Sequence, residues 1–219
     1  MVEFSKIIQT ITIVAPTLLL AVILHETAHG LVAEKLGDPT ARIMGRITLN
    51  PVPHIDPVWT VLIPLVLIVS GSRFIIGGAK PVPINPLNFR NPRRDMMWVS
   101  LSGPATNLAL AIVSAMLFHT MKQAAGDLPS EFFLKILRPV LSMLYVSVLI
   151  NVVLAVFNLI PVPPLDGSKI LMGILPLELS EKMARLEPYG MLILIILIFT
   201  NVLFRVINPI IGLILRMLL

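Results

Sequence analysis

The stretch LLLAVILHETAHGLVAEKLGD (residues 18–38) decides the fold, because it places ionisable side chains inside a run of apolar residues. His25 and His29 stand four positions apart, and Glu26 lies between them. Such side chains are costly in the hydrocarbon of a bilayer, where they usually mark a functional site. The rest of the chain must show whether a bilayer is the setting and which function the three residues serve.

The composition indicates an integral membrane protein. Of the 219 residues, 56% are hydrophobic and 13% are charged, and the mean hydropathy is +0.92, whereas soluble domains are about one quarter charged. No polar stretch is long enough to be a linker, so we expect one membrane domain over residues 1–219, with a core at 10–170 and C-terminal helices at 187–219. The absence of cysteine excludes disulfides and thiolate metal ligands.

Apolar segments of the chain predict an all-α polytopic fold with about 4–6 transmembrane helices, since a span needs about 20 apolar residues. One segment, PVWTVLIPLVLIVSG (57–71), is short, and Pro64 interrupts it, so it either crosses the bilayer or re-enters on one side. The segments lie at residues 7–33, 57–71, 96–121, 138–162, 189–204 and 206–219.

The distribution of Lys and Arg favours a re-entrant segment at 57–71. If the segment re-enters, eleven Lys and Arg residues lie on one side of the bilayer and four on the other. If it crosses, the counts are nine and six. Arg205 and Arg216 are left out of both counts. The positive-inside rule therefore predicts a multi-pass protein of the cell membrane whose site faces the cytoplasm. Orientation in the bilayer also explains the net charge of +5, so we expect no nucleic-acid partner.

A small β-hairpin is expected between the first and third apolar segments. TARIMGRITLN (40–50) is rich in β-branched residues, alternates partly between apolar and polar positions, and is bounded by Gly-Asp-Pro and Asn-Pro.

The residues His25, Glu26 and His29 form the pattern H-E-x-x-H. On a helix, both imidazoles can reach one zinc ion, and the glutamate can act as general base. The pattern alone is weakly specific, and the alternative is a buried pair of helical histidines with a structural glutamate. The cost of burying such a group in apolar surroundings favours the functional interpretation.

A hydrolytic zinc site has three protein ligands and one open position. Asp166 is the strongest candidate for the third ligand, because prolines break the helix in FNLIPVPPLDG (157–167) and allow the carboxylate to turn inward. The alternative is an ordinary Asp-Gly turn at a helix end. The other candidates by residue type are His54, His119, Asp56 and Asp95.

Three blocks resemble the site-2 proteases, which are intramembrane zinc metalloproteases: HETAHG (25–30), SGPATN (102–107) and NLIPVPPLDG (158–167). The resemblance covers about residues 10–170 and is closest to the minimal form without a PDZ or CBS domain. It implies one Zn²⁺ per chain, held by His25, His29 and Asp166, with Glu26 as the catalytic base. It also implies that Asn107 and Asn158 face the active site and hold the substrate backbone or the developing oxyanion.

Two further polar residues, His54 and Asn151, are expected to be satisfied by hydrogen bonds within the protein. His54, in NPVPHIDP, is expected to be a loop residue paired with Asp56, the alternative being a second-sphere group near the zinc. Asn151 is expected to hydrogen-bond between helices, as lone amides in membrane spans do.

The expected function is zinc metalloendopeptidase activity on peptide bonds within or near transmembrane segments of other proteins. The partners would be a transmembrane protein substrate and the lipid bilayer, and the edge of the expected hairpin would pair with the unwound substrate. Two other classes stay open: a membrane ion or metal transporter that uses the same His/Glu/Asp cluster, and an inactive relative that acts as a membrane chaperone. The sequence specifies neither the substrate nor the oligomeric state.

Overall fold

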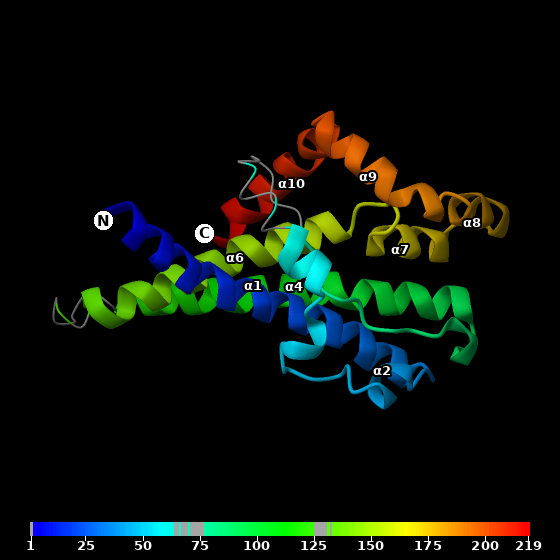
Figure 1. Cartoon of the computed structure of the whole chain (residues 1–219), viewed down its shortest axis with the longest axis horizontal. Coiled ribbons are helices and arrows are strands. Elements are labelled where there is room, and N and C mark those ends of the chain that lie inside the picture. The colour runs from blue at the N-terminus through cyan, green and yellow to red at the C-terminus, as the bar shows by residue number, and fades with distance from the viewer. Residues whose placement is uncertain (1, 64–65, 67–69, 71–76, 125–130, 132) are drawn as a thin grey trace.

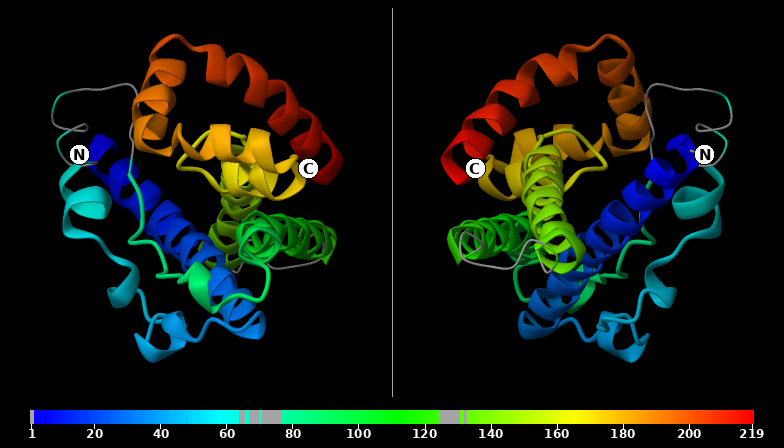
Figure 2. Two further views of the ribbon diagram at one scale, coloured as in Figure 1. Left: turned by 90° about the vertical axis from the view of Figure 1, so that its right-hand side faces the viewer. Right: turned by 90° about the vertical axis from the view of Figure 1, so that its left-hand side faces the viewer.

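Three long apolar helices form the centre of the molecule: α1 (Val2–Lys35), α4 (Pro92–Ala124) and α6 (Arg138–Asn158). α4 and α6 lie side by side along much of their length, and α1 crosses and contacts both of them (Figure 1 and Figure 2). Each of the three is long and apolar enough to cross a bilayer. The expected all-α multi-pass fold is confirmed in these elements. The structure is a computed structural model that describes residues 2–63, 66, 70, 77–124, 131 and 133–219.

The C-terminal part contains α9 (Gly190–Phe199) and α10 (Val202–Leu218), which we call the C-terminal arm. The apolar segment at 189–204 does not form one continuous helix. The chain breaks after Phe199, Asn201 has a left-handed φ of +58°, and the helices on the two sides of the break meet at 76°. Counting this bent pair as one span, up to four spans occur among the described residues. Figure 2 shows the arm arching over the ends of α6 and the following helices.

Two short helices connect α6 to the arm. The prolines after Asn158 end α6 as predicted, and the chain turns before α7 (Asp166–Ile174) and α8 (Leu177–Ala184) begin. A 3₁₀ turn at Glu187–Tyr189 then leads into α9. The turn after α6 therefore places Asp166 at the first position of a new helix.

Residues 36–91, which we call the loop segment, contain α2 (Thr40–Ile43) and single turns at Val52–His54, Pro57–Leu62 and Pro86–Asn88. The predicted β-hairpin at 40–50 is wrong, since the described residues contain no strand. The backbone N–H of Arg46 instead bonds to Ala41 O at 2.8 Å, closing a local turn at Gly45, whose φ is +64°. The local backbone hydrogen bonds thus decide the conformation of this stretch, against the strand preference of its β-branched residues. Much of 57–71 lies outside the described residues, so the re-entrant topology stays a prediction.

The two ends of the loop segment are joined through Asp38. Its buried carboxylate accepts hydrogen bonds from Asn85 N and Asn88 Nδ2, both at 2.7 Å, and from Thr40. Burial acts to raise the pKa of Asp38, but the bonds from Thr40, Asn88 and Asn85 outweigh it and hold the pKa below its ordinary value. The end of α1 and the start of α4 therefore lie at the same end of the bundle.

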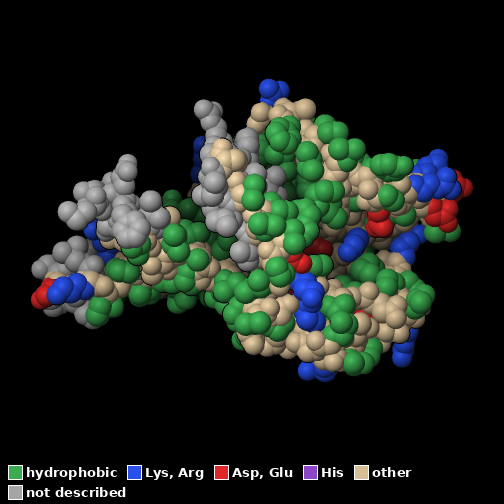
Figure 3. Space-filling view, viewed as in Figure 1, with side chains coloured by type: hydrophobic (Ala, Val, Ile, Leu, Met, Phe, Trp, Pro, Cys, Tyr) green, Lys and Arg blue, Asp and Glu red, His purple; other side chains and the backbone are tan. Residues whose placement is uncertain are grey.

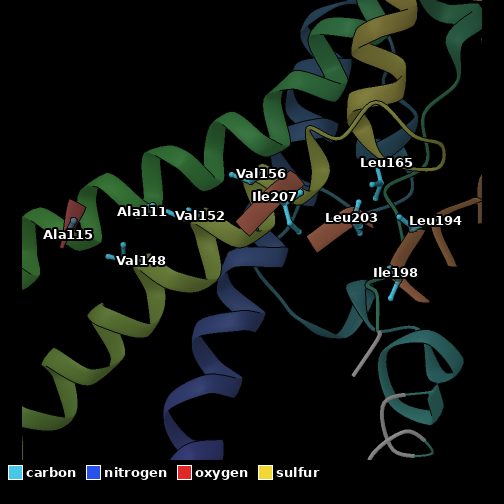
Figure 4. Packing of buried hydrophobic residues seen from close by; sticks show 10 residues of the cluster. All are labelled: Ala111, Ala115, Val148, Val152, Val156, Leu165, Leu194, Ile198, Leu203 and Ile207. Atoms are coloured by element: carbon cyan, nitrogen blue, oxygen red, sulfur yellow. The ribbon is translucent and has the colours of Figure 1, made fainter. Parts of the chain in front are cut away.

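Buried apolar side chains attach the C-terminal arm to the bundle (Figure 4). Val148, Val152 and Val156 of α6 lie in one cluster with Leu203 and Ile207 of α10. On the outer faces large apolar side chains are exposed, and they give the surface its predominantly hydrophobic character (Figure 3). Soluble monomers rarely expose so much apolar surface, which fits a surface in contact with lipid.

Candidate metal centre

The structure brings His25, His29 and Asp166 together. The two histidines lie one turn apart on α1, and Asp166 reaches them from the first turn of α7. Asp166 Oδ2 is 3.2 Å from His25 Nε2 and 3.3 Å from His29 Nε2, and the two Nε2 atoms are 3.0 Å apart. These three residues form a group that could hold a metal ion.

Hydrogen bonds at the other ring nitrogens fix the tautomer of both histidines. His25 Nδ1 lies 2.6 Å from Asn107 Oδ1, and His29 Nδ1 lies 2.7 Å from the carbonyl oxygen of Val99. Both partners accept, so each Nδ1 carries the proton and donates it. Each Nε2 is left with a lone pair directed at the centre of the group, which is the form in which histidine binds a metal.

The arrangement of the three atoms fits a bound cation. Two nitrogen lone pairs and a carboxylate oxygen repel one another at such distances unless a positive charge lies among them. A tetrahedral zinc ion with ligand bonds of about 2.0–2.2 Å separates its ligand atoms by about 3.3–3.5 Å. The distances of 3.0, 3.2 and 3.3 Å are close to that value. Nitrogen and carboxylate oxygen are also a donor set that zinc accepts.

Gly103, in the block SGPATN, lets α4 approach the two histidines. A Cβ atom at this position would lie 2.6 Å from ring atoms of both His25 and His29. Any larger residue would therefore displace the rings. The same block places Ser102, whose Oγ is 3.3 Å from His29 Nδ1.

A chain of buried amides supports His25 from the side away from the metal group. Asn107 Nδ2 donates to Asn151 Oδ1 at 2.8 Å and to Ala21 O at 3.3 Å. Asn151 in turn donates to Ser147 O at 2.9 Å, and both asparagines are almost completely buried. The interhelical role predicted for Asn151 is confirmed. Sequence reasoning did not foresee that Asn151 fixes the amide that holds His25, since only the fold brings α4 and α6 together here.

Asn107 is fully engaged in this network. Its oxygen faces His25, and both of its N–H groups have acceptors. It therefore has no donor left for a substrate oxyanion, and its contacts make it a positioning residue for His25. Asn158 donates to Leu154 O at 3.0 Å in its own helix and has a second N–H group.

Glu26 lies half-buried beside the metal group, and its carboxylate is held by the loop segment. Glu26 Oε2 accepts a hydrogen bond from the backbone N–H of Val82 at 2.8 Å. This contact could not be predicted from the sequence, because any residue except proline could supply the N–H group. The contact joins the loop segment directly to the proposed base.

The remaining candidate ligands lie outside the metal group. His54 Nε2 bonds to Thr48 O at 3.0 Å, so His54 is a loop residue, but its predicted pairing with Asp56 is wrong. Asp56 accepts from Val58 N and Trp59 N, because it caps the turn that follows. Asp95 Oδ2 accepts from Asn91 N at the start of α4, and His119 Nε2 bonds to Leu218 O.

Comparison with known proteins agrees with this geometry. Residues 13–200 match the model of the family described as Peptidase family M50. The chain belongs to peptidase family M50. The matched range includes the whole metal group, the proposed base and the supporting asparagines.

Two curated relatives share a name, "Putative zinc metalloprotease". YwhC of Bacillus subtilis (strain 168) is 36% identical over 184 residues, which are 84% of this chain and 78% of the relative. Rip2 of Mycolicibacterium smegmatis is 31% identical over 187 residues, which are 85% of this chain and 66% of the relative. No solved structure matches this M50 chain.

Proposed function

We propose that the chain is an intramembrane zinc metalloendopeptidase that hydrolyses peptide bonds within or near transmembrane segments of other proteins. The observation that carries the proposal is the convergence of His25, His29 and Asp166 beside Glu26, among apolar helices. Membership of a peptidase family and the names of the relatives support the same reaction.

His25, His29 and Asp166 would hold one zinc ion per chain. When bound, zinc supplies a Lewis acid and lowers the pKa of a coordinated water toward about 7. Asn107 and the Val99 carbonyl keep the protons of both imidazoles on Nδ1, so that neither ring rotates away from the metal group.

Glu26 would accept the proton of the attacking water and return it to the leaving amine. The bond from Val82 N fixes one carboxylate oxygen. The other oxygen has no hydrogen-bond partner among the residues that the structure describes, so it would exchange the proton. The second N–H group of Asn158 would support the developing oxyanion, a task for which Asn107 has no donor left.

We further propose that the site faces the cytoplasm, as the distribution of Lys and Arg predicts. The described contacts support a single polar end of the bundle, because residues of the loop segment, the start of α4 and α7 line one groove there. The substrate helix must unwind before cleavage, since a helix keeps its carbonyls in internal hydrogen bonds. With no hairpin at 40–50, that stretch offers no strand edge for the unwound substrate.

The test compares wild-type protein with Glu26→Gln after reconstitution into vesicles with a panel of single-span membrane proteins. Wild-type protein is expected to release new soluble fragments, whereas Glu26→Gln should release none and retain the same zinc content. Fragments from the Glu26→Gln protein, or none from the wild type, would contradict the proposal. The transporter alternative predicts instead that wild-type vesicles accumulate metal ions without any cleavage.

A further inference from the structure

A groove of about 550 Å³ opens at the polar end of the bundle. The loop segment forms one wall through Val82 and Ile84, and α4 and α7 form another through Met96 and Met172. In Figure 3 the surface is hollowed between the loop segment and the lobe of α7 and α8, and charged side chains line the edges of the hollow. Its size is that of a site for a small ligand or a short peptide.

The groove adjoins the candidate metal centre through two of its lining residues. Val82, which lines the groove, donates its backbone N–H to Glu26 at 2.8 Å. Lys169, which also lines the groove, follows Asp166 by three positions and so lies on the same face of α7. A polypeptide that passes through the metal centre can therefore extend into the groove.

The side of the groove formed by α4 and α7 is cationic. Lys169 is half-buried and makes no ion pair or hydrogen bond within the described part of the chain. The Arg93 guanidinium donates to the carbonyls of Gly173 and Leu175, which hold it in place without neutralising its charge. One acidic residue, Glu187, lines the groove on another element. Two cations that line one groove, with neither of them in an ion pair among the described residues, are suited to an anionic group.

We propose that the groove binds an extended stretch of the substrate next to the scissile bond, and that an aspartate or glutamate of this stretch faces Lys169 and Arg93. The inference rests on the proposed function and adds a substrate preference to it. Apolar side chains of the substrate would lie against Ile84 and Met172. A peptide is favoured over an anionic lipid because Val82 of the groove wall contacts Glu26, so the groove lies next to the proposed site of cleavage.

The first experiment measures the charge of the groove without a substrate. The chain has no cysteine, so Met172→Cys introduces a single thiol. For this thiol we compare the rate of reaction with an anionic methanethiosulfonate reagent to the rate with a cationic one. The ratio of the two rates should be about fivefold higher than the same ratio for Leu49→Cys on the exposed loop. A factor of this size corresponds to about one screened ion pair. Adding Lys169→Glu should abolish the preference, whereas Lys182→Glu, an equal charge change outside the groove, should keep it. An unchanged preference in Lys169→Glu overturns the proposal.

The second experiment uses a single-span protein that the wild type cleaves in the vesicle assay. Asp, Asn or Lys is placed in turn at each of four substrate positions. These are the four positions next to the cleaved bond, on the side that leads out of the substrate's apolar segment. At one of these positions Asp should be cleaved about fivefold faster than Lys, and Lys169→Glu should reverse that order while Lys182→Glu keeps it. Cleavage that is independent of these residues overturns the inference but leaves the proposed function intact.

Two other outcomes are distinguishable. If Lys169→Glu slows cleavage equally for all flanking residues, and only in vesicles that contain anionic lipid, the groove binds a lipid headgroup and the inference is wrong. If the wild type cleaves no protein of the panel, the proposed function fails and the inference falls with it.

Discussion

The metal centre and the C-terminal arm are both attached to the same apolar bundle, but by different kinds of contact. Around the metal centre, buried polar groups join three helices, as in the bonds from Asn107 to His25 and Asn151. The arm packs through apolar side chains such as Leu203 and Ile207, and His119 adds one hydrogen bond to Leu218 O. Hydrogen bonds have preferred lengths and angles, whereas apolar packing requires only close contact. The first region is therefore suited to fixing ligand geometry, and the second to covering the bundle.

The largest effect is expected where a ligand itself is removed. Asp166→Ala leaves His25 and His29 as the only protein ligands in the group, and two ligands do not retain zinc as three do. Metal analysis of the purified protein should show a fall from about one zinc per chain to a trace. Lys169→Ala, on the same helix, serves as the control, and retention of zinc by Asp166→Ala would show that this carboxylate is no ligand.

A pair of glycine substitutions tests whether geometry matters in one region and not in the other. Gly103→Ala would place a Cβ 2.6 Å from both imidazole rings, so zinc affinity, measured by competition with a chelator, should fall by about 10- to 100-fold. At Gly212 of α10 a Cβ would meet nothing within 4 Å. Gly212→Ala should leave zinc affinity unchanged and raise helix stability by up to about 1 kcal/mol. If Gly103→Ala and Gly212→Ala changed zinc affinity equally, the proposed difference between the metal centre and the arm would be wrong.

A smaller effect is expected one step away from the ligands. Asn151→Leu removes the acceptor that orients the Asn107 amide, so the bond to His25 should loosen and zinc affinity should fall by about tenfold. Ser114→Ala is the matched control, because it breaks the 2.8 Å bond to Ser147 further along the same network. If both variants lose thermal stability and neither loses affinity, the network is structural only.

The smallest effect on the metal centre is expected from the arm. Leu203→Ala should leave a cavity beside α6 and lower the unfolding free energy by about 2 kcal/mol. Zinc content and affinity should stay at wild-type values, because the cluster that contains Leu203 is made of apolar side chains and includes neither a proposed ligand nor a supporting amide. Thermal unfolding in detergent measures the first quantity, and chelator competition measures the second. Loss of zinc in this variant would show that the arm does more than cover the bundle.

Several parts of the fold followed from local sequence. The three spans and the break after Asn158 were predicted, because apolar length and proline act within a few residues. The hairpin at 40–50 was wrong because the helical turn at Thr40–Ile43 and the bond from Arg46 N to Ala41 O use backbone groups that a strand pairing would need. The break in the apolar segment at 189–204 could not be predicted, because hydropathy does not register the left-handed residue Asn201.

In the candidate site, too, some features follow from local sequence and others depend on the tertiary structure. His25 and His29 could be paired from spacing alone, since residues four apart share one face of a helix. The contacts of Val99, Val82 and Asn151 could not be predicted. Two of them use backbone atoms, which carry no residue signature, and the third depends on which helices are neighbours.

By itself the sequence determined that the chain spans a membrane, that His25, Glu26 and His29 share a helix, and that Asp166 follows a helix break. It could do so because hydropathy, helical spacing and proline are properties of neighbouring residues. Only the tertiary structure decided that Asp166 reaches both histidines, that Asn107 is committed to His25, and that the loop segment holds Glu26. These contacts join residues far apart in the chain, and only the packing of the helices and the course of the loop segment bring them within hydrogen-bond distance.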